Sequence, residues 1–225
     1  MVMGARWGMI TVIHMHTEHL LTLTQWLSPA YPIGAFAWSH GLERAIQRGD
    51  VNDAAELADW LDAVLTLGAG RSDAILLCSA HAADDVGPIA ELAAALSPSM
   101  ERRMETMQQG AAFAATTRAV WGIELPDMAY PVAVGRAARL MDIPALPTAQ
   151  IWLQAFASNL VQAAQRLMPL GQTEAQRILA GLSKTCATVA AEAIEAELDD
   201  IGTASFAIDI ASMQHAAQQP RIFRS

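Results

Sequence analysis

Residues 148–168 read TAQIWLQAFASNLVQAAQRLM, and this stretch decides the fold class. Its large apolar side chains, among them Ile151, Trp152, Phe156 and Leu160, return every three or four positions. That spacing places them on one face of an α-helix. The stretch therefore predicts a strongly apolar helix, which ends where Pro169 and Gly171 follow.

The same helical spacing recurs along the 225 residues, while strand signals are almost absent. Hydrophobic residues make up 53% and charged residues 16% of the chain, a mixture that favours a folded core over disorder. No stretch resembles a linker or an internal repeat. We predict a single all-α domain of about ten helices over residues 20–225, preceded by a flexible N-terminal tail at 1–19. The predicted helices span 20–27, 35–48, 53–65, 71–83, 88–96, 99–121, 130–141, 148–168 and 173–197, with a less regular C-terminal stretch.

Composition also limits the functional classes. The net charge of −9 argues against binding to nucleic acid or to an anionic membrane. No uncharged apolar run reaches the roughly 18 residues that span a bilayer. Cys78 and Cys186 lie far apart in apolar helical surroundings, where cysteine is usually a small core residue. We therefore expect a cytoplasmic protein with reduced thiols.

Catalytic motifs are not found: the chain has no glycine-rich phosphate loop, no HExxH, no GxSxG and no CxxC. Ser39 and His40 could form a nucleophile and base. However, adjacent residues of a helix point about 100° apart, which favours a role in packing or at an interface. Arg71 could form a surface ion pair with Asp73, or act as a buried anchor or interface group; both interpretations stay open. Five arginines could supply an arginine finger to a GTPase or simply be solvated, namely Arg102, Arg103, Arg118, Arg136 and Arg139.

Three histidines near the start of the chain, His14, His16 and His19, are weak candidates for a metal site. Imidazole suits nickel, copper and zinc, but only Glu18 adds a further ligand nearby. The alternative is a frayed terminus with incidental histidines, and translation could even begin at Met15.

Two segments have the character of contact surfaces. Residues 28–43, SPAYPIGAFAWSHGLE, are apolar and aromatic although two prolines and two glycines predict a turn, and loops are normally solvated. Residues 221–225, RIFRS, place an isoleucine and a phenylalanine between two arginines, side chains that dominate binding hot spots. We expect this segment to dock on its own core or on a partner.

Taken together, these segments resemble the UreF family of urease accessory proteins. The resemblance rests on SPAYPIGAF at 28–36, SHGLE at 39–43, RSD at 71–73, QAFASNL at 154–160, RL at 166–167, LGQ at 170–172, DIASM at 209–213, His215 and RIFRS at 221–225. It implies an all-helical, dimeric, non-catalytic protein without a cofactor. Such proteins join a UreD/UreH-type scaffold and the GTPase UreG in a complex that loads nickel into apo-urease. Their C-terminal tail, here about 205–225, becomes ordered against the scaffold.

The resemblance and the two contact segments predict one set of partner-binding residues: Pro29, Pro32, Gly34, Phe36, His40, Glu43, Arg71, Gly171, Gln172, His215, Arg221, Ile222, Phe223, Arg224 and Ser225. Two other functions stay open, activation of the GTPase by an arginine donated in trans and direct nickel binding as a metallochaperone. The chain departs from the family at Ala216, where Glu is frequent. It departs again at Gln219 and Pro220, where an aromatic-Ser pair is frequent, and Pro220 biases Gln219 towards an extended backbone.

Overall fold

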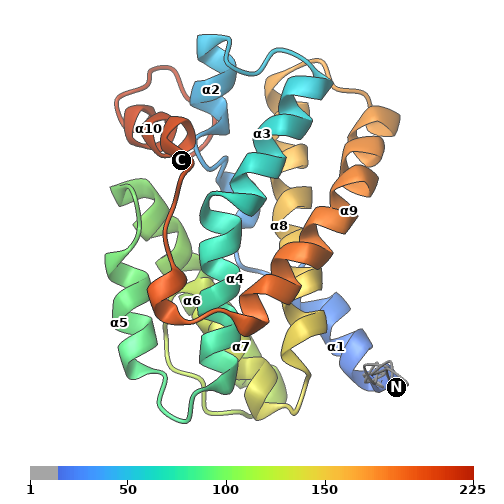
Figure 1. Cartoon of the computed structure of the whole chain (residues 1–225), viewed down its shortest axis with the longest axis vertical. Helices are drawn as coiled ribbons and strands as arrows, with labels where there is room; N and C mark the ends of the chain where they lie inside the picture. Colours follow the sequence, from blue (N-terminus) through green and yellow to red (C-terminus); the bar gives the residue numbers. More distant parts are fainter. Residues whose placement is uncertain (1–14) are drawn as a thin grey trace, which may run out of the picture.

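A computed structural model describes residues 15–225, and within that range the regular structure is helical throughout (Figure 1). The all-α prediction is confirmed. The elements are α1 Thr17–Trp26, η1 Ala35–Ala37, α2 Leu42–Arg48, α3 Ala54–Thr66, α4 Ala69–Ala82, α5 Gly87–Ala95, α6 Met100–Trp121, α7 Tyr130–Leu140, α8 Ala145–Leu167, α9 Gln172–Glu195, η2 Leu198–Asp200 and α10 Phe206–His215.

Helix α4 lies at the centre of the molecule and contacts α3, α5, α7, α8 and α9 (Figure 1). Ile75 and Leu77 are fully buried on it. Its closest neighbour is α7, because Gly135 lets the two backbones meet: a Cβ at this position would overlap the carbonyl oxygen of Leu77. Asp73, one of the charged residues described below, lies on α4.

One stretch, Ala54–Ala82, is long and apolar enough to cross a membrane by length and composition alone. It consists of α3 and α4, and 61% of its most apolar window is buried inside the fold. A core helix passes the same test, so this stretch is weak grounds for a membrane span. Its apolar character is explained by its place in the core.

The continuous helix predicted at 35–48 is wrong in its first half, whereas residues 42–48 form α2 as predicted. The chain forms the short 3-10 helix η1, becomes extended at Trp38, and turns through His40 (φ 58°) and Gly41 (φ 79°) before α2 begins. Glycine is required at position 41 for two reasons. Its φ is positive, and a Cβ there would lie 2.8 Å from the backbone nitrogen of Ser212 on α10. The break brings α10 against this turn.

At the other end, α1 begins at Thr17 and not at residue 20. The amide of Leu20 donates to the carbonyl of His16, which opens the helix, and Leu23 and Trp26 anchor it in the core. Residues 17–19, which we assigned to the N-terminal tail, are therefore helical, and residues 1–14 lie outside the described range.

Both cysteines are core residues, as predicted. Cys78 and Cys186 are buried and free. Burial raises the pKa of the Cys78 thiol to about 12 and that of Cys186 to about 11. Both side chains are therefore uncharged members of the core.

Candidate partner-binding surface

The C-terminal tail, residues 216–225, is docked on the chain's own body beside α2 and α10, where the C-terminus lies in Figure 1. Short backbone pairing holds it to the turn before α2. The amide of Arg224 donates to the carbonyl of Ala37 at 2.9 Å, and the amide of Ser39 donates to the carbonyl of Ser225 at 3.0 Å. The Ser39 hydroxyl contacts the same oxygen of Ser225, and the His40 amide donates to the Ser225 hydroxyl at 3.2 Å. Ser39 and His40 thus receive the tail of their own chain, which is a packing role. A role of this pair at an interface with a partner stays a prediction.

The carboxylate of Glu43 holds the tail by accepting two of its main-chain amides. Glu43 lies in the first turn of α2 with only 5% of its surface exposed. Its carboxylate accepts the amide of Ile222 at 2.7 Å and the amide of Phe223 at 2.9 Å. Hydrogen bonds to a charged acceptor are roughly twice as strong as neutral ones. A single side chain therefore fixes two consecutive residues of the tail.

His215, the last residue of α10, connects Glu43 to α6. The ring is fully buried, with Nδ1 2.8 Å from Oε2 of Glu101 and Nε2 3.1 Å from Oε2 of Glu43. Glu101 also accepts a hydrogen bond from the guanidinium of Arg221 at 2.7 Å. Helices α2, α6 and α10 and the tail therefore meet in one cluster of charged groups.

A second charged cluster begins at the next residue of α6, Arg102. Arg102 pairs with Glu105 at 2.5 Å and with Asp73 of α4 at 3.6 Å. Glu105 also accepts the hydroxyl of Ser225 at 3.2 Å. Burial raises the pKa of Asp73 to about 6, although the Arg102 guanidinium opposes this. Arg102 is thus a buried, paired residue, and the solvated helix face considered for it in the sequence is wrong.

His40 stands beside the second cluster in its neutral form. Burial, reinforced by the positive charge of Arg102, holds the pKa of His40 well below its usual value. The ring packs edge-on against Phe156, with centroids 5.1 Å apart. The neutral ring of His40 therefore stabilises the turn by packing on Phe156.

Two arginines cover the aromatic residues of the tail and the turn. The guanidinium of Arg166 lies 4.3 Å from the centre of the Phe223 ring and donates to the carbonyl of Phe36 at 2.8 Å. Arg224 lies over Trp38 at 5.5 Å. Phe223 and Trp38 are consequently buried.

The neighbours of these two aromatic residues point outward. Phe36 is 74% exposed and Ile222 is 60% exposed. The tail is therefore held by buried polar anchors while it presents apolar side chains to solvent.

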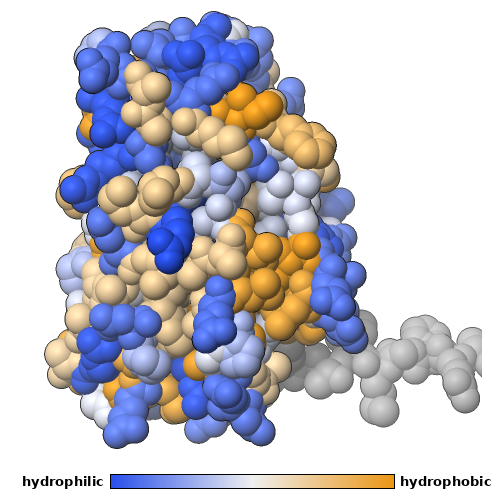
Figure 2. Space-filling view, turned by 90° about the vertical axis from the view of Figure 1, so that its left-hand side faces the viewer, coloured by the Kyte–Doolittle hydropathy of each residue, from blue (hydrophilic) through white to orange (hydrophobic). Residues whose placement is uncertain are grey.

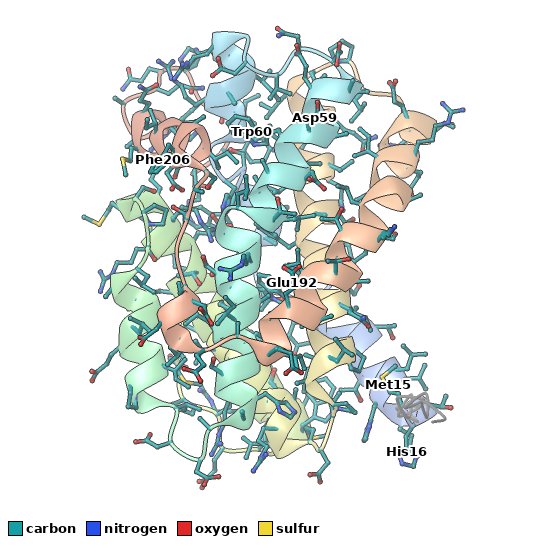
Figure 3. All side chains as sticks on the ribbon, in the orientation of Figure 1. Met15, His16, Asp59, Trp60, Glu192 and Phe206 are labelled. Carbon is teal, nitrogen blue, oxygen red and sulfur yellow. The ribbon has the colours of Figure 1, made fainter. Side chains whose placement is uncertain are left out.

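A further apolar strip follows the outer face of α10. Phe206, Ile210 and Met213 are 71%, 46% and 52% exposed and lie at helical spacing on one face. Met100, at the start of α6, is 74% exposed, and the hydroxyls of Ser99 and Ser212 join the two helices at 2.8 Å. Figure 3 shows Phe206 at the margin of the molecule on α10. On the face to which α5 and α10 belong, hydrophobic areas cross the middle and hydrophilic side chains border them above and below (Figure 2).

Sequence reasoning missed this strip, because its apolar residues match those of a core helix in type and spacing.

The sequence also disfavoured a pocket beside the 28–43 run. Pro29, Tyr31 and Ile33 line a cavity of about 90 Å³ whose polar wall includes Asp73 and Glu105. The run is thus partly the wall of a partly open pocket and partly the dock for the tail.

Other predicted residues lie apart from the tail or at the edge of the cavity. Arg71 donates to the backbone carbonyl of Asp200 at 2.7 Å, while Asp73 pairs with Arg102 instead. A role of Arg71 at an interface stays a prediction. Gly171 and Gln172 are exposed at the start of α9, and Pro32 and Gly34 belong to the turn before η1.

The histidine cluster is only partly described. His14 lies outside the described residues, while the rings of His16 and His19 lie edge-to-face with centroids 5.4 Å apart. Figure 3 shows His16 at the end of α1, far from Phe206 and the docked tail. Within residues 15–225, no three His, Cys, Asp or Glu side chains are grouped to hold a metal.

Comparison with known proteins identifies relatives over nearly the whole chain. A family model described as UreF matches residues 51–183. The urease accessory protein UreF of Roseobacter denitrificans is 49% identical over 215 residues, covering 95% of this chain and 97% of that protein. Its counterpart in Cereibacter sphaeroides is 52% identical over 206 residues, covering 92% of this chain and 98% of that protein. The one in Bradyrhizobium diazoefficiens is 45% identical over 221 residues, covering 92% and 91%.

Proposed function

The chain belongs to the UreF family of urease accessory proteins, and we propose that it is a non-catalytic adaptor in urease maturation. In this role it binds a UreD/UreH-type scaffold and the GTPase UreG, as a homodimer, and regulates GTP-dependent insertion of nickel into apo-urease. The cytoplasm suits this role, because the free thiols of Cys78 and Cys186 stay reduced there.

One observation carries the scaffold-binding part of the proposal. The tail is fixed by buried charged anchors, yet Ile222 and the neighbouring Phe36 stay exposed. Exposed large apolar side chains in a fixed arrangement are typical of interaction sites, because the partner need not order them on binding. The apolar strip of Phe206, Ile210 and Met213 on α10 extends the same surface.

The test is co-purification of the full chain with the scaffold, followed by addition of the GTPase. We expect a double variant, Phe36→Ser with Ile222→Ser, to lose the scaffold while it keeps its helix content, since both side chains are mostly exposed. Leu21→Ser is the matched control, because Leu21 is 63% exposed on α1, at the other end of the molecule. Retention of the scaffold by the double variant would exclude this surface as the scaffold site.

The GTPase part is tested separately. Single-turnover GTP hydrolysis by the GTPase is measured with and without the adaptor–scaffold complex. Regulation predicts a changed rate, either faster or slower. An unchanged rate at saturating complex would contradict it.

A further inference from the structure

A partly open pocket of about 210 Å³ lies between α4, α5, α6 and the segment that leads into α10. Its wall is mostly apolar and includes Leu76 of α4, Leu96 at the end of α5, and Pro98. Two carboxylates also line it, Asp73 of α4 and Asp209 of α10. The pocket therefore combines an aliphatic wall with two acidic groups.

Asp73 lines this pocket without a full counter-ion. The 3.6 Å contact between its carboxylate and the guanidinium of Arg102 is its only ion pair within residues 15–225. Arg102 lies closer to Glu105, at 2.5 Å, so one guanidinium serves two carboxylates. The side chain of Asp73 is 16% exposed, whereas that of Arg102 is 7% exposed. Asp73 is therefore the member of this group that a cation in the pocket can reach.

Asp209 joins the pocket to the apolar strip on α10. Its carboxylate accepts the hydroxyl of Thr203 at 2.7 Å, and it forms no ion pair within residues 15–225. Asp209 follows Phe206 by three positions and precedes Ile210, and both of these strip residues are exposed. Residues three positions apart are neighbours on the surface of a helix. The acidic pocket and the apolar strip therefore form one continuous surface.

The charges around the pocket do not balance. Burial raises the pKa of Asp73 to about 6, so this carboxyl is mostly ionised at neutral pH. Asp73, Glu105 and Asp209 then contribute three negative charges, and Arg102 contributes one positive charge. No other basic residue lines the pocket within residues 15–225, so two negative charges remain in excess. A partly buried carboxylate without a partner is costly, and a cation in the pocket would remove that cost.

We propose that this pocket receives a basic side chain of the scaffold, a lysine or an arginine, within the contact that covers the apolar strip on α10. The aliphatic part of such a side chain fits against Leu76 and Leu96, while its charged end pairs with Asp73. Charge complementarity selects this occupant, because an apolar side chain would leave the carboxylates unpaired and an acidic one would be repelled. The identity of the occupant rests on the proposed function and states the chemistry by which the scaffold is recognised.

The pocket can be probed in the full chain without the scaffold. n-Butylammonium chloride carries a primary ammonium on a short aliphatic chain, and 1-butanol is its uncharged analogue. We expect butylammonium to shift the amide NMR resonances of Gly202 and Thr203, which line the pocket, with saturation in the millimolar range. Sodium chloride at the same ionic strength is the control for salt. A response that does not saturate, or one that butanol reproduces, would overturn the cation pocket.

Charge variants test the occupant by their affinity for the scaffold. D73N combined with D209N removes both charges and keeps the size of both side chains, so affinity should fall at least about tenfold. D59N combined with E192Q is the matched control and should keep the wild-type affinity. Asp59 on α3 and Glu192 on α9 are exposed and do not line the pocket (Figure 3). Equal affinities of the two folded double variants would contradict the proposal.

A second pair of variants serves if circular dichroism shows that D73N with D209N is unfolded. Leu96 is 45% exposed beside the pocket, so its replacement should not disturb the core. Leu96→Lys and Leu96→Glu remove the same apolar side chain but add opposite charges. Leu96→Lys should bind the scaffold severalfold more weakly than Leu96→Glu, and the difference should shrink at high salt. The same affinity for both variants would exclude a basic occupant.

Failure of this occupant and failure of the proposed function give different results. If the wild-type chain binds the scaffold and the charge variants bind it equally well, the adaptor function stands and the basic occupant is wrong. If the wild-type chain does not bind the scaffold, the adaptor function is wrong and the occupant is overturned with it, even where butylammonium binds.

Discussion

Glu43 is the residue on which tail docking depends most, because it accepts two consecutive main-chain amides and contacts His215. We expect Glu43→Gln to lower the free energy of unfolding by about 1–3 kcal/mol, since one acceptor oxygen becomes a donor that faces donors. The tail should also loosen, so trypsin should cleave after Arg221 and Arg224 severalfold faster, as measured by mass spectrometry of the C-terminal fragments. Glu174→Gln, at an exposed position in the first turn of α9, is the control. Equal cleavage rates in the two variants would contradict the role of Glu43.

Asp73 gives the free energy of unfolding a pH dependence whose sign is unusual for an aspartate. Its pKa is raised from 3.8 to about 6 by burial, so the folded chain binds a proton that the unfolded chain has released. The proton on Asp73 stabilises the folded state below about pH 4, and this stabilisation is lost as pH rises to about 6. It amounts to at most about 3 kcal/mol. Asp73→Asn should therefore gain stability relative to wild type between about pH 4 and about pH 7, measured by urea unfolding at each pH. A constant difference between the two proteins would show that Asp73 titrates normally.

The two thiols provide a check on the core. Because burial raises the pKa of Cys78 to about 12 and that of Cys186 to about 11, neither should react with a thiol reagent in the native protein. Both should react once guanidinium chloride unfolds the chain. Rapid reaction of one thiol under native conditions would reveal local opening of α4 or α9.

At the scale of elements, the long helices could be predicted and the turn before α2 could not. The predicted helix at 148–168 is α8, Ala145–Leu167, because its apolar spacing reflects burial against the core. The composition of residues 35–48 also predicts a helix, because Ala, Leu, Glu and Arg all have high helix propensity. The break at His40 and Gly41 is imposed by α10, which is remote in the sequence, and local propensity carries no information on that contact.

Gly41 supplies a test of that contact between elements. Gly34 and Gly41 both have positive φ, 71° and 79°, but a Cβ at Gly34 meets nothing within 4 Å whereas one at Gly41 meets the backbone of Ser212. Gly34→Ala should cost about 1 kcal/mol through backbone strain alone. Gly41→Ala should lower the free energy of unfolding by about 2 kcal/mol more than Gly34→Ala does. The additional cost comes from overpacking, because α10 must move to accommodate the new Cβ. Similar unfolding free energies for the two variants would mean that α10 adapts freely.

At the scale of the whole molecule, several residues that dock the tail were selected from the sequence, but their buried partners and the apolar strip on α10 were not. Glu43, His215 and the RIFRS segment were identified from the sequence as partner-binding residues. Their partners Glu101 and Glu105 lie more than a hundred positions from the tail and have the composition of an ordinary charged helix face. Charge type alone does not reveal which residues are buried together, because the same side chains are usually solvated.

The tail and the body should consequently behave as one energetic unit, which a double-mutant cycle can measure. Deleting residues 221–225 removes the tail partners of Glu43, Glu101 and Glu105, so we expect a loss of a few kcal/mol with helix content retained. In the truncated chain the amides that Glu43 binds are gone, so Glu43→Gln should then cost much less than it does in the full chain. The difference is the coupling energy of Glu43 and the tail, expected at about 0.5–3 kcal/mol from equilibrium unfolding. Additive losses would show that Glu43 stabilises the body independently, and the tail would then be an appendage rather than part of the fold.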